Sequence, residues 1–352
     1  MKKIKKIISK SAVLYQQNKP LRILNIELPE YLERGQVLVK VHYSGICGSQ
    51  IGEIDGVKGP DRFLPHLLGH EGVCSILEVG SGVKNIKKGD RAIIHWRPGK
   101  GINSQTPIYK YRGKRINAGW ATTFNEYAIV SENRLTRTSK NTNMLTEPLF
   151  GCAITTGFGV IENNAKLRKG ESVLVYGAGG VGLNMIQLAS IKKAYPIIAV
   201  DIFHNKLKLA KRCGATHVIK SSNIKYSKTK IIKVLGNQSL DVFIDNTGNT
   251  KVIELGYEVT SKNGRLVLVG VPKKTEKISI NTLPLHFGKE ISGSEGGNCF
   301  PTLDIPRYRR LLNQSKYKLR LLISKIYSLE NINTAIKDMR SGKVPGRVII
   351  KL

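Results

Sequence analysis

Hydrophobic and polar positions follow two different patterns along this chain. Up to about residue 150, short apolar runs end at turn signals such as Gly80-Ser-Gly82 and Lys88-Gly-Asp90. Short runs bounded by glycine and aspartate are typical of antiparallel strands. The pattern predicts strands over 12–15, 36–43, 72–79, 91–96 and 124–130. Their spacing suits a small, mostly β, barrel-like domain.

After about residue 153, apolar runs alternate with helical periods. This alternation is typical of a parallel sheet covered by helices, a doubly wound α/β fold. Because 352 residues exceed the usual size of one domain, we expect two domains, each with its own core. The pattern predicts strands over 173–176, 197–200, 241–244 and 265–269, helices over 182–192, 206–212, 308–312 and 332–339, and a last strand over 347–352.

The charge of the chain is unusually positive. Its 57 Lys and Arg residues stand against 25 Asp and Glu residues, giving a formal net charge of +32. Clustered cations would indicate nucleic-acid binding. Here they recur from Lys2 to Lys351 without zinc-finger spacing, an aromatic RNA-binding signature or one dominant tract. We therefore expect a solvated, lysine-rich surface with no specific nucleic-acid partner, which adheres to polyanions at low salt.

The lengths of the apolar runs and the number of cysteines restrict where the protein can be located. No run approaches the roughly 18 apolar residues that cross a bilayer, and the basic start leads into no such segment. We expect a cytoplasmic protein without a membrane partner. The five cysteines form an odd, scattered set, which favours metal or catalytic use over a disulfide framework. Of these, Cys74, Cys213 and Cys299 lie beside no other ligand type, so we expect them to be packing residues.

A glycine-rich loop predicts a dinucleotide site. Gly177-Ala-Gly-Gly-Val-Gly182 fits the pattern G-x-G-x-x-G between a predicted strand and a predicted helix. Gly177 permits the tight turn, Gly179 the approach of a pyrophosphate, and Gly182 close packing of helix and strand, with Gly180 and Val181 completing the loop. Asp201 ends the next strand, where a carboxylate accepts hydrogen bonds from ribose hydroxyls. This favours NAD over NADP, and Lys206 is a further candidate contact to the ribose.

Three ligand types occur in glycine-flanked segments far apart in the chain. Cys47 lies in Gly45-Ile-Cys-Gly-Ser49, His70 in Gly69-His-Glu-Gly72, and Cys152 in Gly151-Cys-Ala-Ile-Thr-Thr-Gly157. Taken singly, a cysteine is more often buried packing and a histidine more often a hydrogen-bonded structural group. Together, two thiolates and one imidazole are a known catalytic zinc set that leaves a fourth position open.

With these motifs in order, the chain resembles the zinc alcohol dehydrogenase branch of the medium-chain dehydrogenase/reductase family. Val79-Gly-Ser-Gly-Val83, Gly89-Asp90 and the closing Arg347 extend the resemblance nearly end to end. It implies a catalytic, GroES-like domain over 1–153 with 298–352 and a Rossmann cofactor domain over 154–297. The active site would lie between them. The resemblance also implies a homodimer or homotetramer built through an edge strand near 290–297.

The resemblance further implies roles for single residues. Cys47, His70 and Cys152 would be the zinc ligands, and Glu71, behind the metal, would exchange onto it during turnover. Ser49 would hydrogen-bond the substrate oxygen, Thr156 would lie against the nicotinamide, and Arg347 would meet the pyrophosphate. Zn²⁺ supplies a Lewis acid that lowers the pKa of an alcohol hydroxyl, and hydride passes between the alcohol or carbonyl carbon and NAD.

Some positions depart from the family pattern. Many members hold a structural zinc with four cysteines between about 96 and 120, but this chain has no cysteine there, so we expect one zinc per subunit. Gln50 stands where an aspartate usually supports the ligand histidine, which weakens the expected retention of the metal. Gly52 replaces a proton-relaying histidine, so the proton leaves through water, the ribose or a group such as Glu53. Glu147, before Pro148, is an alternative ligand.

Other functions stay open from the sequence. A polyol, sugar or amino-alcohol dehydrogenase would use the same metal chemistry. A dehydrogenase of a formaldehyde–thiol adduct would suit the positive surface. A protein that kept the fold and lost turnover is the rival from another class, and the intact Cys47, His70 and Cys152 set argues against it.

Overall fold

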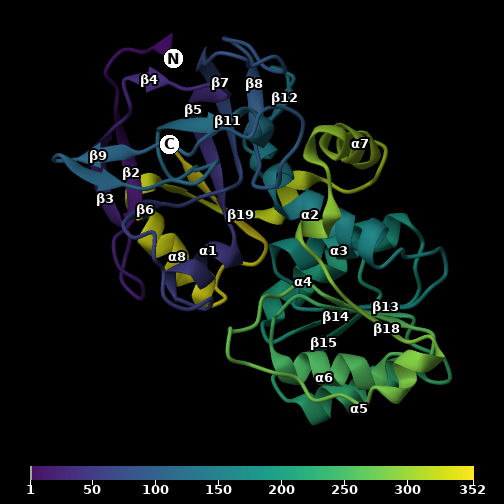
Figure 1. Cartoon of the computed structure of the whole chain (residues 1–352). Coiled ribbons are helices and arrows are strands. Elements are labelled where there is room, and N and C mark those ends of the chain that lie inside the picture. Colours follow the sequence, from purple (N-terminus) through teal and green to yellow (C-terminus); the bar gives the residue numbers. More distant parts are fainter. Residues whose placement is uncertain (1) are drawn as a thin grey trace.

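The structure is a computed structural model, and it describes residues 2–352. Two lobes lie side by side, one rich in strands and one built on a parallel sheet with helices, as Figure 1 shows. The labelled chain ends both lie in the strand-rich lobe (Figure 1). Among the described residues, no helix is both long and apolar enough to traverse a bilayer.

The second lobe contains a six-stranded sheet in the order β15-β14-β13-β16-β17-β18, and every neighbouring pair is parallel. Helices cover both of its faces, α3 and α4 on one side and α5 and α6 on the other (Figure 1). This is the doubly wound α/β fold that the alternating pattern predicts. The strands are β13 Val173–Tyr176, β14 Ile197–Asp201, β15 His217–Lys220, β16 Val242–Asp245, β17 Arg265–Leu268 and β18 Glu290–Gly293, and the helices are α3 Gly180–Ile191, α4 His204–Arg212, α5 Ile224–Leu235 and α6 Thr250–Val259.

The first lobe combines two larger sheets and a two-stranded one. One sheet runs β12-β8-β7-β5-β20-β19 with β11 also on β5, another runs β10-β9-β3-β2-β6, and β1 pairs with β4. The strands are β1 Lys2–Lys3, β2 Ile8–Leu14, β3 Arg22–Glu27, β4 Tyr31–Leu32, β5 Gln36–Ile46, β6 His66–Leu67, β7 Gly72–Val79, β8 Arg91–Ile94, β9 Tyr109–Tyr111, β10 Lys114–Ile116, β11 Tyr127–Ser131, β12 Leu135–Thr138, β19 Ile323–Ser328 and β20 Arg347–Lys351. Its helices are α1 Gly48–Ile54 and α8 Ile332–Arg340.

The end of the chain returns to the first lobe. β20 pairs antiparallel with β5, the strand that leads to Cys47. Helix α2, Ala153–Gly159, and helix α7, Pro301–Asn313, lie where the two lobes meet (Figure 1). Gly159 is in close contact with the turn at Gly296–Asn298, since a Cβ at Gly159 would lie 2.3 Å from the Gly297 oxygen. The residue limits of the two domains stay a prediction.

The apolar pattern predicts ten of the twenty strands and four of the eight α-helices that the structure describes. The predicted strand over 36–43 extends to Ile46, and the predicted helix over 182–192 begins two residues earlier, at Gly180. Helices α1, α2, α5 and α6 were not predicted, nor were strands β1, β3, β4, β6, β9, β10, β12, β15 and β19, and β18 was implied only by the resemblance. Helix α2 is buried along its whole length, so its apolar residues show no helical period. Helix α5 carries four lysines in Ile224–Leu235, which mask its three buried positions.

Candidate metal and cofactor site

Three side chains that are distant in sequence meet at one point. Cys47 follows β5, His70 precedes β7, and Cys152 precedes α2. One ligand atom from each lies within 4.8 Å of the others, and the Cys47 and Cys152 sulfurs are 3.9 Å apart. Both cysteines are buried and His70 is nearly so. The structure thus brings together the three residues that the sequence predicts as metal ligands.

Glycines allow these segments to approach each other. A Cβ at Gly45 would lie 2.3 Å from the Glu71 Oε1 atom, and one at Gly151 would lie 2.8 Å from the Glu71 Cα atom. A side chain at either position would collide with Glu71, the residue after His70. The glycines around the three ligands are therefore a packing requirement of the site.

The donor atoms fit a bound Zn²⁺ ion. The His70 Nε2 atom is buried and has no hydrogen-bond partner among residues 2–352. Such a group is costly unless a ligand compensates it. A hydrogen bond from the Cys152 thiol lowers the pKa of Cys47 well below its usual range, which favours the thiolate that binds metal. Two sulfurs and one imidazole nitrogen match a catalytic zinc set.

A buried ion pair lies behind the three ligands. The Arg347 Nη1 atom is 3.4 Å from the Glu71 Oε1 atom and donates a 3.0 Å hydrogen bond to the Ile46 carbonyl. Burial raises the pKa of Glu71, and the charge of Arg347 opposes that shift. Arg347 also reaches the glycine loop, since a Cβ at Gly180 would lie 2.5 Å from its Nε atom. Its Nε and Nη2 atoms are buried without partners, which fits an anionic cofactor there.

Two hydroxyls flank the cysteines. Ser49 lies two residues after Cys47, on α1, and its side chain is exposed. The Thr156 Oγ1 atom is 3.9 Å from the Cys152 sulfur, on the first turn of α2. Their predicted roles toward a substrate oxygen and a nicotinamide ring stay predictions.

Gln50 contacts Cys47. Its side-chain oxygen accepts a 2.8 Å hydrogen bond from the Cys47 backbone N–H, while its Nε2 atom is buried without a partner. Gln50 thus fixes the turn that presents the Cys47 sulfur. Gly52, the other departure from the family pattern, lies next to Val57, which would be 3.6 Å from a Cβ at that position.

The glycine loop has the geometry of a dinucleotide site. Gly177 has a φ of +101° at the end of β13, and a Cβ at Gly182 would lie 2.1 Å from the Gly177 oxygen. Helix α3 begins at Gly180, so its first amide groups point toward the loop. The Asp201 carboxylate accepts 2.9 Å hydrogen bonds from the Ala178 and Phe203 N–H groups.

Two residues of this region were not predicted. The Asn246 side-chain amide donates a 3.0 Å hydrogen bond to the Gly177 carbonyl and so holds the glycine turn. The Trp96 ring lies 6.4 Å from the His70 ring, centroid to centroid. Asn246 follows the predicted strand over 241–244 and Trp96 ends the predicted strand over 91–96, and that position at a strand end was the available signal. The Lys206 ammonium lies 4.7 Å from the centre of the Phe203 ring.

Other candidates lie outside the group. Glu147 receives hydrogen bonds of 2.6 and 2.8 Å from Arg309, so its carboxylate is already paired. Cys74, Cys213 and Cys299 are buried and free, and burial raises the thiol pKa of Cys213 to about 12 and that of Cys299 to about 11. These are the properties of packing cysteines.

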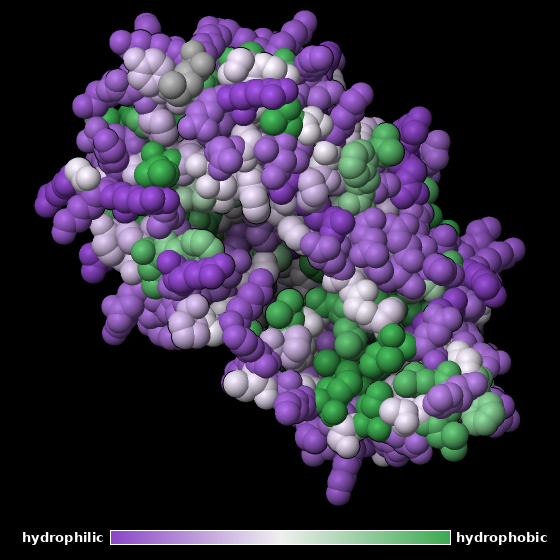
Figure 2. Space-filling model, in the orientation of Figure 1, coloured by the Kyte–Doolittle hydropathy of each residue, from purple (hydrophilic) through white to green (hydrophobic). Residues whose placement is uncertain are grey.

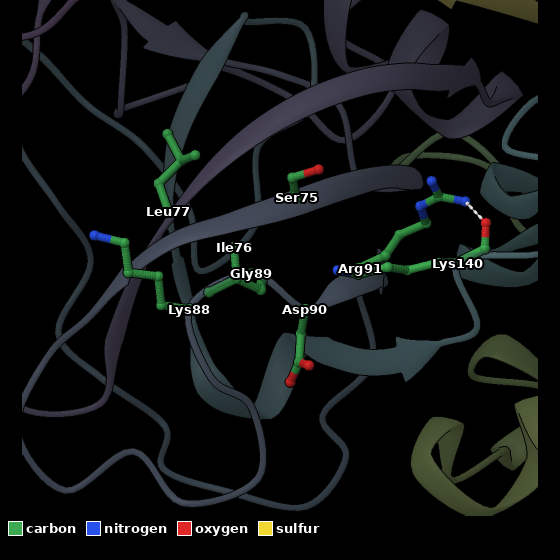
Figure 3. Close-up of a pocket in the computed structure, with 8 residues that line it drawn as sticks. All are labelled: Ser75, Ile76, Leu77, Lys88, Gly89, Asp90, Arg91 and Lys140. Carbon is green, nitrogen blue, oxygen red and sulfur yellow. Dashed lines mark hydrogen bonds between the residues drawn. The ribbon is translucent and has the colours of Figure 1, made fainter.

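Cys47, His70 and Cys152, with Glu71 and Arg347 behind them, form the metal group. The pocket in Figure 3 is separate from it. It encloses about 470 Å³ on the first lobe, between β7, β8 and the segment at Lys140, where Arg91 donates a 2.7 Å hydrogen bond to the Lys140 carbonyl. None of the predicted site residues lines it. We assign it no role in catalysis.

Comparisons with known proteins agree with the site. Residues 33–140 match the alcohol dehydrogenase GroES-like domain, and residues 180–314 match the zinc-binding dehydrogenase family. S-(hydroxymethyl)glutathione dehydrogenases of Escherichia coli and Synechocystis are 30% and 29% identical, each over 95% of this chain and 97% of the relative.

Solved structures give the same result. Benzyl alcohol dehydrogenase of Acinetobacter calcoaceticus has a TM-score of 0.87 at 28% identity, covering 99% of this chain and all of that one. An alcohol dehydrogenase zinc-binding domain protein of Burkholderia ambifaria has a TM-score of 0.88 at 27% identity, with the same coverage. This chain therefore belongs to the zinc-dependent alcohol dehydrogenases of the medium-chain family, which are NAD-dependent oxidoreductases acting on CH–OH donors.

Proposed function

We propose that this enzyme transfers a hydride between a primary alcohol carbon and NAD at a single zinc site formed by Cys47, His70 and Cys152. The observation that carries the proposal is the convergence of the three ligand atoms within 4.8 Å around a buried, unpartnered imidazole nitrogen. When bound, Zn²⁺ supplies a Lewis acid that lowers the pKa of the alcohol hydroxyl.

The surrounding residues position the reactants. The exposed Ser49 hydroxyl hydrogen-bonds the substrate oxygen and accepts its proton for transfer to solvent. Thr156 lies against the nicotinamide and fixes the ring face that meets the substrate. Glu71, the residue after His70, is held by Arg347 and is the candidate for a transient fourth ligand. Positioning of this kind contributes roughly 7–11 kcal/mol in favourable intramolecular cases.

The cofactor is bound mainly by backbone and by two charged residues. The glycine loop and the start of α3 receive the pyrophosphate, and the free Arg347 nitrogens neutralise it. Asp201 accepts hydrogen bonds from the adenosine ribose, and Lys206 adds a contact there. A 2′-phosphate would meet the charge of Asp201, so the site favours NAD over NADP.

The substrate class follows from the relatives. The names of the curated relatives and of one structural neighbour, S-(hydroxymethyl)glutathione and benzyl alcohol dehydrogenases, share a terminal –CH₂OH group. We infer that this chain acts on the same group, either in an alcohol or in a hydroxymethyl adduct of a thiol. The site geometry fits both substrates, an alcohol and a hydroxymethyl adduct of a thiol. A panel of substrates therefore distinguishes between them.

Assembly and location are part of the same proposal. Strand β18 pairs only with β17, so its outer edge is open, and the nearby Leu283 and Phe287 are 58% and 56% exposed. Figure 2 shows apolar side chains gathered on this lobe. An open edge beside apolar surface favours a homodimer through β18.

The five free thiols favour the cytoplasm, and we keep the domain limits 1–153 with 298–352 and 154–297.

One experiment tests the proposed function. Purified enzyme is analysed for zinc and assayed by NADH absorbance with benzyl alcohol, S-(hydroxymethyl)glutathione, a secondary alcohol and a polyol, each with NAD and with NADP. We expect about one zinc per chain, turnover of at least one primary alcohol and a preference for NAD. A zinc-loaded enzyme that binds NADH but oxidises no alcohol would refute the proposal.

A further inference from the structure

A cation follows the aromatic ring beside the metal group. Trp96 lies 6.4 Å from His70 by ring centroids, and the Arg97 guanidinium carbon lies 5.7 Å from the centre of the Trp96 ring. The Trp96 ring is therefore a neighbour both of His70, a predicted metal ligand, and of the positive charge of Arg97. Both residues follow β8, which lies in the same sheet as β7, the strand that His70 precedes.

Arg97 crosses from one lobe to the other. Its Nε atom donates a 3.0 Å hydrogen bond to the Cys299 carbonyl, and its Nη1 atom donates one of 2.5 Å to the Glu295 backbone carbonyl. The Nη1 atom also lies 3.2 Å from a Glu295 carboxylate oxygen. The turn that it contacts is packed on Trp96, since a Cβ at Gly296 would lie 2.4 Å from the indole ring. Figure 2 shows the surface hollowed between the two lobes. The guanidinium and the Trp96 ring therefore both contact the turn at 295–299.

The carboxylate that pairs with Arg97 is weakly held. The Glu295 side chain is 78% exposed, whereas that of Arg97 is 18% exposed. An exposed carboxylate is well solvated and gains little from the pair, about 0.2–1 kcal/mol. Among residues 2–352, no hydrogen bond uses the Arg97 Nη2 atom. Arg97 is thus a mostly buried cation with an exchangeable anionic partner and an open donor.

A second arginine nearby increases the positive charge. Arg134 is buried, lies 5.3 Å from the Trp120 ring centre, and forms no ion pair among residues 2–352. Its Nη1 atom has no hydrogen-bond partner in that range. Burial and the charge of Arg97 lower the pKa of Arg134 to about 10. Among residues 2–352, Arg134 thus adds a second guanidinium without an ion pair, while the Glu295 carboxylate pairs with Arg97.

We propose that Arg97 is a specificity-determining residue, which binds a carboxylate at the far end of the alcohol substrate and exchanges Glu295 for it. This inference rests on the proposed function and names its substrate class, an anionic primary alcohol. The –CH₂OH group lies at the Cys47, His70 and Cys152 group, the spacer passes along the Trp96 ring, and the carboxylate meets the guanidinium. The overall charge of +32 steers such anions toward the enzyme.

The test compares two alcohols that differ only in charge, benzyl alcohol and 4-(hydroxymethyl)benzoate, in full-length holoenzyme. The measured quantity is the ratio of their kcat/KM values, carboxylate over neutral. We expect R97Q to lower this ratio roughly tenfold to a hundredfold, mostly through KM, because a charge-assisted hydrogen bond is lost. E295Q should raise it roughly two- to fivefold, because a neutral amide competes less well for Arg97. The R97K variant should recover part of the ratio.

The matched control is K110Q, which removes one exposed cation from β9. It should reproduce the small loss in ratio that comes from net charge alone. If R97Q and K110Q change the ratio equally, or if E295Q lowers it, Arg97 does not select the carboxylate and the inference is wrong. If R97Q fails to fold, the sign of the E295Q effect decides alone. Failure of the proposed function is distinct, since the wild-type enzyme would then oxidise neither alcohol.

Discussion

The metal group and the segment from 97 to 120 adjoin the same strand, β8, but their polar groups are satisfied in opposite ways. In the metal group, the His70 Nε2 atom and two Arg347 nitrogens are buried and have no hydrogen-bond partner among residues 2–352, and Glu71 has only its ion pair with Arg347. The segment instead contacts Glu132, which accepts four hydrogen bonds of 2.8 Å, one from the Ile102 N–H of the segment and three from Lys84 and Asn85. Trp120 donates another to the Ser104 carbonyl.

Whether buried polar atoms have hydrogen-bond partners distinguishes a site that binds a ligand from a region that is only structural. Buried polar atoms without partners are rare in proteins, so a cluster of them indicates a bound metal or cofactor. A segment whose donors already reach a buried carboxylate needs no metal to hold it. The single-zinc expectation stays a prediction. The Ile102–Glu132 and Trp120–Ser104 hydrogen bonds support it, because they hold the segment through protein groups alone.

The largest expected effect is at the metal group. We expect Cys47→Ser to lower kcat by more than a hundredfold and to remove zinc, because weakening the supports of ligands alone costs roughly 10–100-fold. NADH affinity should persist, since the glycine loop is untouched. Zinc analysis, NADH fluorescence and the alcohol assay measure the three quantities. Cys213→Ser, the same change at a buried cysteine in the second lobe, is the control. Equal activity in the two variants would exclude Cys47 as a ligand.

The next effect concerns His95, at the start of the segment. Its Nδ1 donates to the Arg97 carbonyl and its Nε2 accepts from Thr136, so the ring is held neutral. Burial lowers the pKa of His95 to about 4, against 6.5 when unfolded. Between these values the unfolded chain binds the extra proton, so stability falls as pH drops from 6.5 to 4, by roughly 3 kcal/mol.

The control for this prediction is His95→Asn, whose amide can replace the Nδ1 donor but does not titrate. Urea unfolding at pH 7 and pH 5 measures both proteins. The wild type should lose more stability than the variant over this interval. Parallel losses would mean that His95 does not contribute to the pH dependence.

A smaller effect is expected at the carboxylate that holds the segment. In Glu132→Gln, the new amide NH₂ would face the Ile102 N–H, and one charged acceptor is lost. We expect the free energy of unfolding to fall by about 2 kcal/mol with zinc content unchanged. Glu258→Gln removes an exposed carboxylate and should change little. Loss of zinc in Glu132→Gln alone would show that the segment and the metal group depend on each other.

The two regions also differ in how far the sequence predicts them. Cys47, His70, Cys152 and the glycine loop sit in motifs of fixed spacing, so their convergence was predictable. Glu132 and Trp96 have no motif: their roles depend on which backbone amides and rings the fold brings beside them, over separations of 30 residues or more in the case of Glu132. Helix α2 escaped prediction for a related reason, because a fully buried helix has no polar face.

The smallest expected effect is at Gln50, whose side chain has one polar atom with a hydrogen-bond partner and one without. Its oxygen caps the Cys47 N–H, and its Nε2 atom has no partner. Gln50→Asp replaces that amide with a carboxylate, which would support the charge of the zinc–histidine unit. We expect zinc affinity, measured by competition with a chelator, to rise about tenfold. Gln50→Asn shortens the side chain without adding charge, so it reports the cost of losing the cap. If both variants lose zinc equally, Gln50 acts only through Cys47, and the unpartnered amide has no bearing on the metal.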